Sequence, residues 1–168
     1  MHISPSTPFL YSDLKPENIL LDDDCHAKIA DLGLSFFNVS EHRRVTGCNG
    51  TISYMAPEVI RGDPYFTVAD YFSLGIIVYE MALVISPFYS RQKTKRELLT
   101  TILTKKVYYP LEFNHHLRDL IEKLLHLDQE KRKDLVKDLR GHPFFKNINW
   151  AELEKRPSPP EILFGSYF

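Results

Sequence analysis

The chain has 168 residues, of which 43% are hydrophobic, so it is long enough to bury one ordinary core and one domain is expected. Its formal net charge of −1 gives no electrostatic reason to expect nucleic acid or a membrane surface as a partner. Its two cysteines, Cys25 and Cys48, are too few for a disulfide framework, which favours a reducing cytoplasmic or nuclear compartment.

Residues 1–10 contain Pro5 and Pro8 among serine and threonine and are expected to be irregular. They lack the basic leader and the apolar centre of a signal peptide, so secretion is not expected. The longest apolar run, residues 74–85, is interrupted by Glu80 and is shorter than the roughly 20 apolar residues that a membrane span needs. This run therefore predicts a buried helix and no membrane span.

Residues 11–33 read Y-S-D-L-K-P-E-N-I-L-L-D-D-D-C-H-A-K-I-A-D-L-G. Two short apolar runs, at 19–21 and 29–30, flank the turn-prone aspartates at 22–24. This pattern predicts a β-hairpin near residues 19–30 with a polar loop on each side of it.

The two loops beside the predicted hairpin carry chemically active side chains. The first holds Asp13, Lys15 and Asn18, and the second opens at Asp31. Together they offer an acid that can take a proton, a cation that can hold a phosphate, and two oxygen ligands for Mg²⁺. Phosphoryl transfer needs those parts and little covalent chemistry besides.

The rest of the chain is expected to be helical. Residues 67–85 are apolar nearly all round, which predicts a central buried helix. Residues 91–106 form a second helical candidate, and residues 115–127 follow the i, i+3, i+4, i+7 pattern behind Asn114, a suitable N-cap. A shorter helix is expected to end near Gly141. The predicted fold class is mainly α with a short β-hairpin.

The stretch at 11–33 resembles the catalytic and metal-binding loops of eukaryotic protein kinases, whose usual pattern is H/Y-R-D-L-K-P-E-N followed by D-F-G. The resemblance continues in order through Gly50-Thr51, then Y-M-A-P-E at 54–58 and D-Y-F-S-L-G at 70–75. It implies a protein-kinase-like fold of which this chain holds the large lobe only.

The end of the chain resembles one group within that family. H-P-F-F at 142–145, followed by I-N-W and later P-P, resembles the end of the large lobe and the start of the tail in AGC-group kinases, near the protein kinase C branch. The implied boundaries are a large-lobe portion at 11–145 and the start of an AGC-type tail at 146–168. Trp150 is expected to anchor that tail by packing.

The resemblance implies a role for each active side chain. Asp13 would accept the proton of a substrate hydroxyl, and Lys15 would neutralise the γ-phosphate of ATP. Asn18 and Asp31 would bind Mg²⁺ and the nucleotide, and the hydroxyl of Thr51 would brace Asp13 and Lys15. Lysine at this position together with the Gly-Thr pair is typical of serine/threonine kinases. The implied cofactors are ATP and Mg²⁺, and the implied partner is a protein substrate or a regulatory protein.

Four further residues have implied structural or regulatory roles. Glu58 is expected to pair with Arg132, which lies in D-Q-E-K-R where the family has D-P-x-x-R. Asp70 resembles the acid that holds the backbone of the catalytic loop. Thr46 stands where AGC-group kinases carry a phosphorylatable threonine, and an ordinary loop threonine is the equal alternative.

The chain also departs from the family pattern. Ser12 replaces the usual arginine, Ile52 stands where many relatives have proline, and Leu32 replaces the usual phenylalanine and is expected to fill a hydrophobic slot. The first glycine is Gly33, so no Gly-rich phosphate loop precedes the motif in this sequence. Besides a kinase, two alternatives therefore stay open: a non-catalytic, kinase-derived interaction module and an incomplete gene product.

Overall fold

The computed structural model describes residues 8–23, 25–88, 94–104 and 106–155. Its helices and short 3-10 turns, in chain order, are η1 (Pro16–Asn18), η2 (Ile52–Tyr54), α1 (Pro57–Arg61), α2 (Val68–Leu83), α3 (Lys95–Thr104), α4 (His115–Leu124), α5 (Gln129–Lys137), η3 (Leu139–Gly141), η4 (Pro143–Phe145) and α6 (Trp150–Lys155). Its strands are β1 (Phe9–Leu10), β2 (Ile19–Leu21), β3 (Ala27–Ile29) and β4 (Phe36–Phe37). The predicted fold class, mainly α with a short hairpin, is confirmed.

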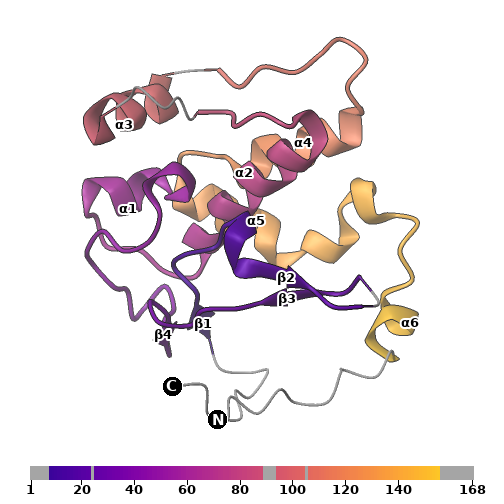
Figure 1. Cartoon of the computed structure of the whole chain (residues 1–168), viewed down its shortest axis with the longest axis horizontal. Helices are drawn as coiled ribbons and strands as arrows, with labels where there is room; N and C mark the ends of the chain where they lie inside the picture. The colour runs from indigo at the N-terminus through magenta and orange to yellow at the C-terminus, as the bar shows by residue number, and fades with distance from the viewer. Residues whose placement is uncertain (1–7, 24, 89–93, 105, 156–168) are drawn as a thin grey trace.

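Helix α2 lies at the centre of the core, as its apolar surface predicts, and it packs against α4 and α5 (Figure 1). Phe72 and Ile76 are wholly buried on α2, and Ile121 of α4 is buried in the same cluster. The helix ends one or two residues inside the predicted limits, because Val84 adopts a left-handed conformation with φ 59° and ends the helical hydrogen bonding.

Gly75 explains how closely α2 and α4 approach. A Cβ atom at this position would lie 2.8 Å from the Cβ of Leu124 and 2.9 Å from a methyl of Leu125. Any larger residue would push the two helices apart, so the glycine of the D-Y-F-S-L-G run has a packing reason.

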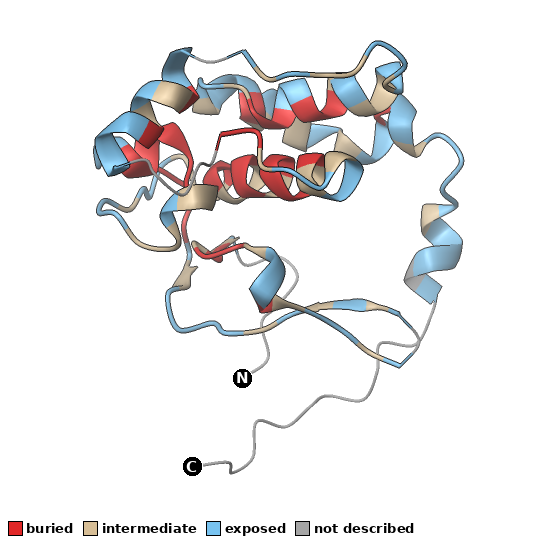
Figure 2. Cartoon of the chain, turned by 45° about the horizontal axis from the view of Figure 1, so that its top comes forward, coloured by how far each residue is buried: buried red, intermediate tan, exposed pale blue. Residues whose placement is uncertain are grey.

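The predicted hairpin is formed by β2 and β3, which pair antiparallel with Ile19 opposite Ile29. Figure 2 shows that burial is concentrated in the helices while the hairpin is largely exposed. Leu20 is 55% and Leu21 is 68% exposed.

Other expectations need correction. Most of the segment expected to be irregular lies outside the described residues, but its end at Phe9–Leu10 is a strand, since it pairs with Phe36–Phe37. Helix α3 is observed at Lys95–Thr104, within the helix expected at 91–106. Residues 91–93 and 105 of that expected helix lie outside the described residues.

The helix expected to end near Gly141 ends earlier. Helix α5 stops at Lys137 with Asp138 as its C-cap residue, and Gly141 closes the separate turn η3. Beyond it, the indole N–H of Trp150 donates to the carbonyl oxygen of Arg140 at 3.1 Å, and its ring packs edge-on against Phe145. These contacts fit the expected anchoring role of Trp150, which begins α6. Residues 156–168 of the predicted tail lie outside the described residues.

None of the helices in the described part of the chain is long and apolar enough to cross a membrane.

Candidate active site

Asp13, Lys15 and Thr51 are in direct contact, although 36 residues separate the last two. The ammonium of Lys15 donates to Asp13 Oδ2 at 2.8 Å and to Thr51 Oγ1 at 2.8 Å. The backbone N–H of Thr51 donates to the other carboxylate oxygen of Asp13 at 2.7 Å. Both oxygens of Asp13 are therefore oriented by donors, which fixes the direction in which this carboxylate points.

Gly50 permits this arrangement. It has φ 106°, in the region that favours glycine, and a Cβ atom there would lie 2.3 Å from the carbonyl oxygen of Ser12. Only glycine lets the chain pass this close to the loop that carries Asp13 and bring the next residue, Thr51, against Asp13.

Asn18 is buried beside the same carboxylate. Its side-chain NH₂ donates to the carbonyl oxygen of Asp13 at 3.0 Å and to Asp13 Oδ2 at 3.2 Å. These bonds hold the amide in one orientation, with its carbonyl oxygen as the atom that could bind a metal. Asn18 is placed by η1, which begins at Pro16, a residue whose fixed φ suits the first position of a helical turn.

The register of the two strands brings Asp31 to the end of the hairpin at which Asn18 lies. Since Ile19 lies opposite Ile29, the residues just beyond them lie together, and Ala30 N–H donates to Asn18 O at 2.9 Å. Asp31 follows Ala30 with φ 59°, and its carboxylate accepts from Gly33 N–H at 3.2 Å. Asp31 is exposed to solvent, so its oxygens are accessible to a metal ion.

Asp70, in the first turn of α2, holds the backbone before Asp13. Its two oxygens accept from the N–H groups of Tyr11 at 2.7 Å and Ser12 at 2.9 Å. Ser12 has φ 72°, an uncommon conformation for a non-glycine residue, and these bonds support it. Asp70 therefore contacts the backbone of the loop that carries Asp13, where the sequence resemblance places such an acid.

The electrostatics favour a charged pair at Asp13 and Lys15. Burial opposes ionisation of Asp13, but the hydrogen bonds from Lys15 and Thr51 outweigh it and hold the pKa of Asp13 below its ordinary value. The hydrogen bond to Asp13 likewise raises the pKa of Lys15. The two directions agree, and both describe a carboxylate and an ammonium that stabilise each other.

Glu58 and Arg132 form the expected buried pair, with Arg132 donating to Glu58 Oε1. Burial raises the pKa of Glu58, although Arg132 opposes that shift. The second oxygen, Oε2, is buried without a protein hydrogen-bond partner. The contact is therefore single, and a two-pronged guanidinium–carboxylate contact is absent.

Two of the residues singled out in the sequence lie apart from these contacts. Thr46 is exposed on the loop before Gly47. The expectation that Leu32 fills a hydrophobic slot is wrong, because its side chain is 43% exposed. No described apolar element covers the start of the loop that opens at Asp31, so an apolar side chain there remains in contact with solvent.

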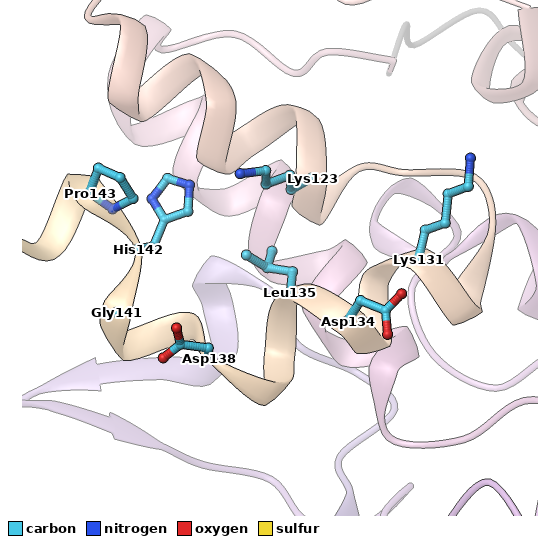
Figure 3. Close-up of a pocket in the computed structure, with 8 residues that line it drawn as sticks. All are labelled: Lys123, Lys131, Asp134, Leu135, Asp138, Gly141, His142 and Pro143. Carbon is cyan, nitrogen blue, oxygen red and sulfur yellow. The ribbon is translucent and has the colours of Figure 1, made fainter.

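A cavity of about 400 Å³ lies between the end of α4 and the chain from α5 to η4, away from the loop that carries Asp13 (Figure 3). Lys131 and Asp134 lie at one end of it, and His142 and Pro143 lie at the other. His142 is already engaged, since Nε2 contacts Asp119 at 2.9 Å and Nδ1 accepts from Phe144 N–H at 3.3 Å. This cavity shares no residue with the site around Asp13.

The sequence did not reveal the charged contacts that attach the segment before Thr51 to α5. Arg44 pairs with Glu130 at 2.8 Å, and Lys133 pairs with Glu41. The i, i+3 spacing of Glu130 and Lys133 was the one available signal, and it indicates only a pair within the helix.

Comparison with known proteins covers most of the chain. The family described as "Protein kinase domain" matches residues 1–145. Rhodopsin kinase GRK1 of Homo sapiens is 42% identical over 160 residues, which cover 92% of this chain and 28% of that protein. Protein kinase C delta type of Mus musculus is 39% identical over 155 residues, covering 92% and 23%. Serine/threonine-protein kinase Sgk1 of Oryctolagus cuniculus is 39% identical over 159 residues, covering 92% and 36%. The chain therefore spans about a quarter to a third of the length of these relatives.

Proposed function

The chain belongs to the protein kinase family, with AGC-group serine/threonine kinases among its relatives, and from that membership we propose that it carries the catalytic and metal-binding loops of an ATP-dependent protein serine/threonine kinase. The observation that carries the proposal is the contact set of Asp13, Lys15 and Thr51, with Asn18 on the same carboxylate. Residues 11–145 are the proposed large-lobe portion and residues 146–168 the proposed start of the tail.

In the proposed reaction, a serine or threonine hydroxyl of a protein substrate attacks the γ-phosphorus of ATP. Asp13 accepts the hydroxyl proton, the bond from the γ-phosphorus to the bridging oxygen breaks, and ADP leaves. Lys15 holds a positive charge beside Asp13, where it can stabilise the negative charge of the transferring group. Thr51 keeps both side chains in place.

Protein kinases generally use ATP with Mg²⁺, and the donor set here suits that ion. Mg²⁺ prefers hard oxygen ligands and takes one or two from the protein while nucleotide phosphates supply others. Asn18 offers an amide oxygen and Asp31 a carboxylate at the same end of the hairpin. We propose these two residues as the metal ligands, with Lys15 as a further contact to the nucleotide.

The serine/threonine preference and the setting are part of the same proposal. Lys15 in contact with Thr51 supports a serine/threonine type. Cys25 and Cys48 are both free thiols, which supports a reducing cytoplasmic or nuclear compartment.

The test is a transfer assay with the native protein, purified from its source after its intact mass has been measured. We expect transfer of the γ-phosphoryl group to serine and threonine peptides, and a loss of about 10²–10⁴-fold in Asp13→Asn, the usual contribution of a general base. Asp63→Asn is the matched control, since Asp63 is a surface partner of Arg61 outside the loop. Undiminished transfer by Asp13→Asn, or transfer to tyrosine alone, would overturn the proposal.

A second candidate is a non-catalytic interaction module. It is favoured by a cavity of about 420 Å³ whose lining is wholly apolar: Leu74, Val78, Met81, Ala82, Leu117, Leu120, Leu124, Leu139, Phe144 and Phe145. Exposed apolar grooves of this kind are typical of protein contacts. A native protein without transfer activity, whose cellular effect persists in Asp13→Asn, would select this second function.

A further inference from the structure

The orientation of Asp13, the proposed base, depends on how the segment at residues 31–58 packs against the rest of the protein. Thr51 belongs to this segment, and its N–H and hydroxyl contact Asp13 and Lys15. If the segment lifted away from the helices, Asp13 would lose one of its donors and Lys15 one of its acceptors. The contacts that attach the segment to the helices therefore bear on the site.

One end of the segment is attached to α5 by the buried pair. Glu58, in the first turn of α1, contacts Arg132 of α5, and both side chains are almost completely buried. This contact follows Thr51 in the chain, at the C-terminal end of the segment.

A second attachment to α5 is a network of four charges, two on the segment and two on the helix. Arg44 donates to Glu130 Oε1 at 2.8 Å, Lys133 donates to Glu41, and Lys133 also lies 3.6 Å from Glu130 Oε2. Charges of opposite sign alternate along the path Glu41, Lys133, Glu130, Arg44. We call these four residues the α5 network.

Backbone structure brings the two segment charges to one helix. Ser40 and Arg43 exchange hydrogen bonds of 3.0 and 3.1 Å, which closes a tight turn. Glu41 lies within this turn and Arg44 directly follows it. The turn is followed by Val45, which exchanges two bonds of 2.9 Å with Tyr65. The backbone beside the network is thus bonded to Tyr65, which follows α1 in the chain.

Arg44 is held from two directions. Its guanidinium carbon lies 4.9 Å from the centre of the Phe66 ring while its Nη2 contacts Glu130. A guanidinium can stack on an aromatic face and pair with a carboxylate at the same time. The hydrogen bond to Lys133 also lowers the pKa of Glu41 and raises that of Lys133, two directions that agree.

We propose that the α5 network is a positioning device, which together with the buried pair holds residues 31–58 against α5 at two points so that Thr51 stays in contact with Asp13. Glu41, Arg44, Glu130 and Lys133 are then positioning residues for the kinase site, an assignment that rests on the proposed function of Asp13. The device uses charges of the chain itself, so it acts with Thr46 in its unmodified form.

The test measures amide hydrogen exchange at Thr51 by NMR in the 168-residue chain, without nucleotide. In Lys133→Glu, where the substituted side chain would face both Glu41 and Glu130, we expect the protection of the Thr51 amide to fall about five- to tenfold. The protection of Ile76, in the centre of α2, should not change, which separates local release from global unfolding.

Three variants complete the design. Lys133→Arg should keep Thr51 protected, because the charge is preserved. The double change Glu41→Lys with Lys133→Glu restores a pair of opposite sign and should recover most of the protection. Lys131→Glu makes the same charge change at an exposed position of α5 and should have no effect on Thr51.

The proposal would be overturned by unchanged protection of Thr51 in Lys133→Glu, or by equal losses in Lys133→Glu and Lys131→Glu. A parallel loss at Thr51 and Ile76 would also count against it, because the network would then stabilise the whole fold and not the segment. Because the measurement involves no catalysis, each of these results leaves the assignment of Asp13 to be decided by its own transfer assay.

Discussion

Arg132 reaches Glu58 through the interior of the protein, and the same guanidinium also donates to two backbone carbonyl oxygens, those of His126 and, at 3.3 Å, Val68. Its side chain is 0% exposed. One side chain therefore joins α5 to the end of the segment, to the start of α2 and to the loop before α5. The ring of Phe72 lies beneath it, 5.5 Å from the guanidinium carbon.

Removing this guanidinium should destabilise the fold strongly. Arg132→Ala leaves the Glu58 carboxylate buried without its cation, and we expect the free energy of unfolding to fall by about 3–5 kcal/mol. Arg132→Lys should recover only part, because one ammonium cannot reach three acceptors. Urea unfolding measures both. Arg61→Ala, which removes an exposed pair with Asp63, should cost no more than about 1 kcal/mol. An Arg132→Ala protein as stable as the wild type would refute the role of the pair.

Asp70 should make stability depend on pH in an unusual direction. Burial raises its pKa to about 6 from 3.8, although the N–H groups of Tyr11 and Ser12 oppose the shift. The folded state then binds the proton more tightly than the unfolded state, so stability from this group is present below pH 3.8 and is lost as the pH rises through 6. Between pH 7 and pH 5 the gain should be about 1 kcal/mol.

The comparison with Asp70→Asn isolates this group from the other titrating residues. We expect the difference in unfolding free energy between the wild type and Asp70→Asn to shift by that amount, in favour of the wild type, as the pH falls from 7 to 5. Chemical denaturation at several pH values provides the measurement. Parallel curves for the two proteins would mean that Asp70 titrates in its ordinary range.

A negative charge at Thr46 should have little effect. Ser12 replaces the usual arginine of the family. Of the two cations just before Thr46 in the sequence, Arg43 is exposed and Arg44 is already engaged by Glu130 and Phe66. Thr46→Glu should change stability by only about 0–1 kcal/mol, the usual range for surface charges. Thr100→Glu, at an exposed position of α3, is the control for the added charge. Limited proteolysis of the segment supplies the measurement, and a large gain in resistance specific to Thr46→Glu would contradict the prediction.

The 168-residue chain by itself should bind Mg²⁺-ATP weakly. Asp31 is exposed and hydrated, and one carboxylate with one amide gains little over the hydration shell of the ion. A ligand at 100 times its Kd would stabilise the fold by about 2.7 kcal/mol and raise the Tm by roughly 5–10 °C. We expect a shift near zero at millimolar nucleotide, the same in the wild type and in Asp31→Ala. A shift of several degrees that disappears in Asp31→Ala would show that the chain binds nucleotide without help.

The elements were predictable because their signals are local. The apolar residues at 67–85 predict α2, the spacing at 115–127 with Asn114 as N-cap predicts α4, and the aspartates at 22–24 predict the turn of the hairpin. In α4 the Asn114 side chain accepts from Leu117 N–H at 3.0 Å, a contact between residues three apart. Patterns of this kind depend on the periods of helix and strand, which the sequence displays directly.

The members of the candidate site were named from the sequence, and their geometry was expected only in part. Asp13, Lys15, Asn18 and Asp31 were identified by resemblance to a known pattern, and so were the partners Glu58 and Arg132, 74 residues apart. The resemblance also implied that Thr51 braces Asp13 and that Asp70 holds the loop backbone, but it did not state which atoms meet or that Ser12 adopts a left-handed conformation. Those contacts follow from how α2 and the segment pack against the loop.

The α5 network and the exposure of Leu32 were decided only by the tertiary structure. Arg44 and Glu130 are 86 residues apart, and Glu41 and Lys133 are 92 apart, so each pair forms only because the core places α5 beside the turn. Leu32 is apolar by composition, yet it stays exposed because no described element covers it. Side-chain chemistry determines which groups can pair or be buried, whereas the packing of distant elements determines which of them come within reach.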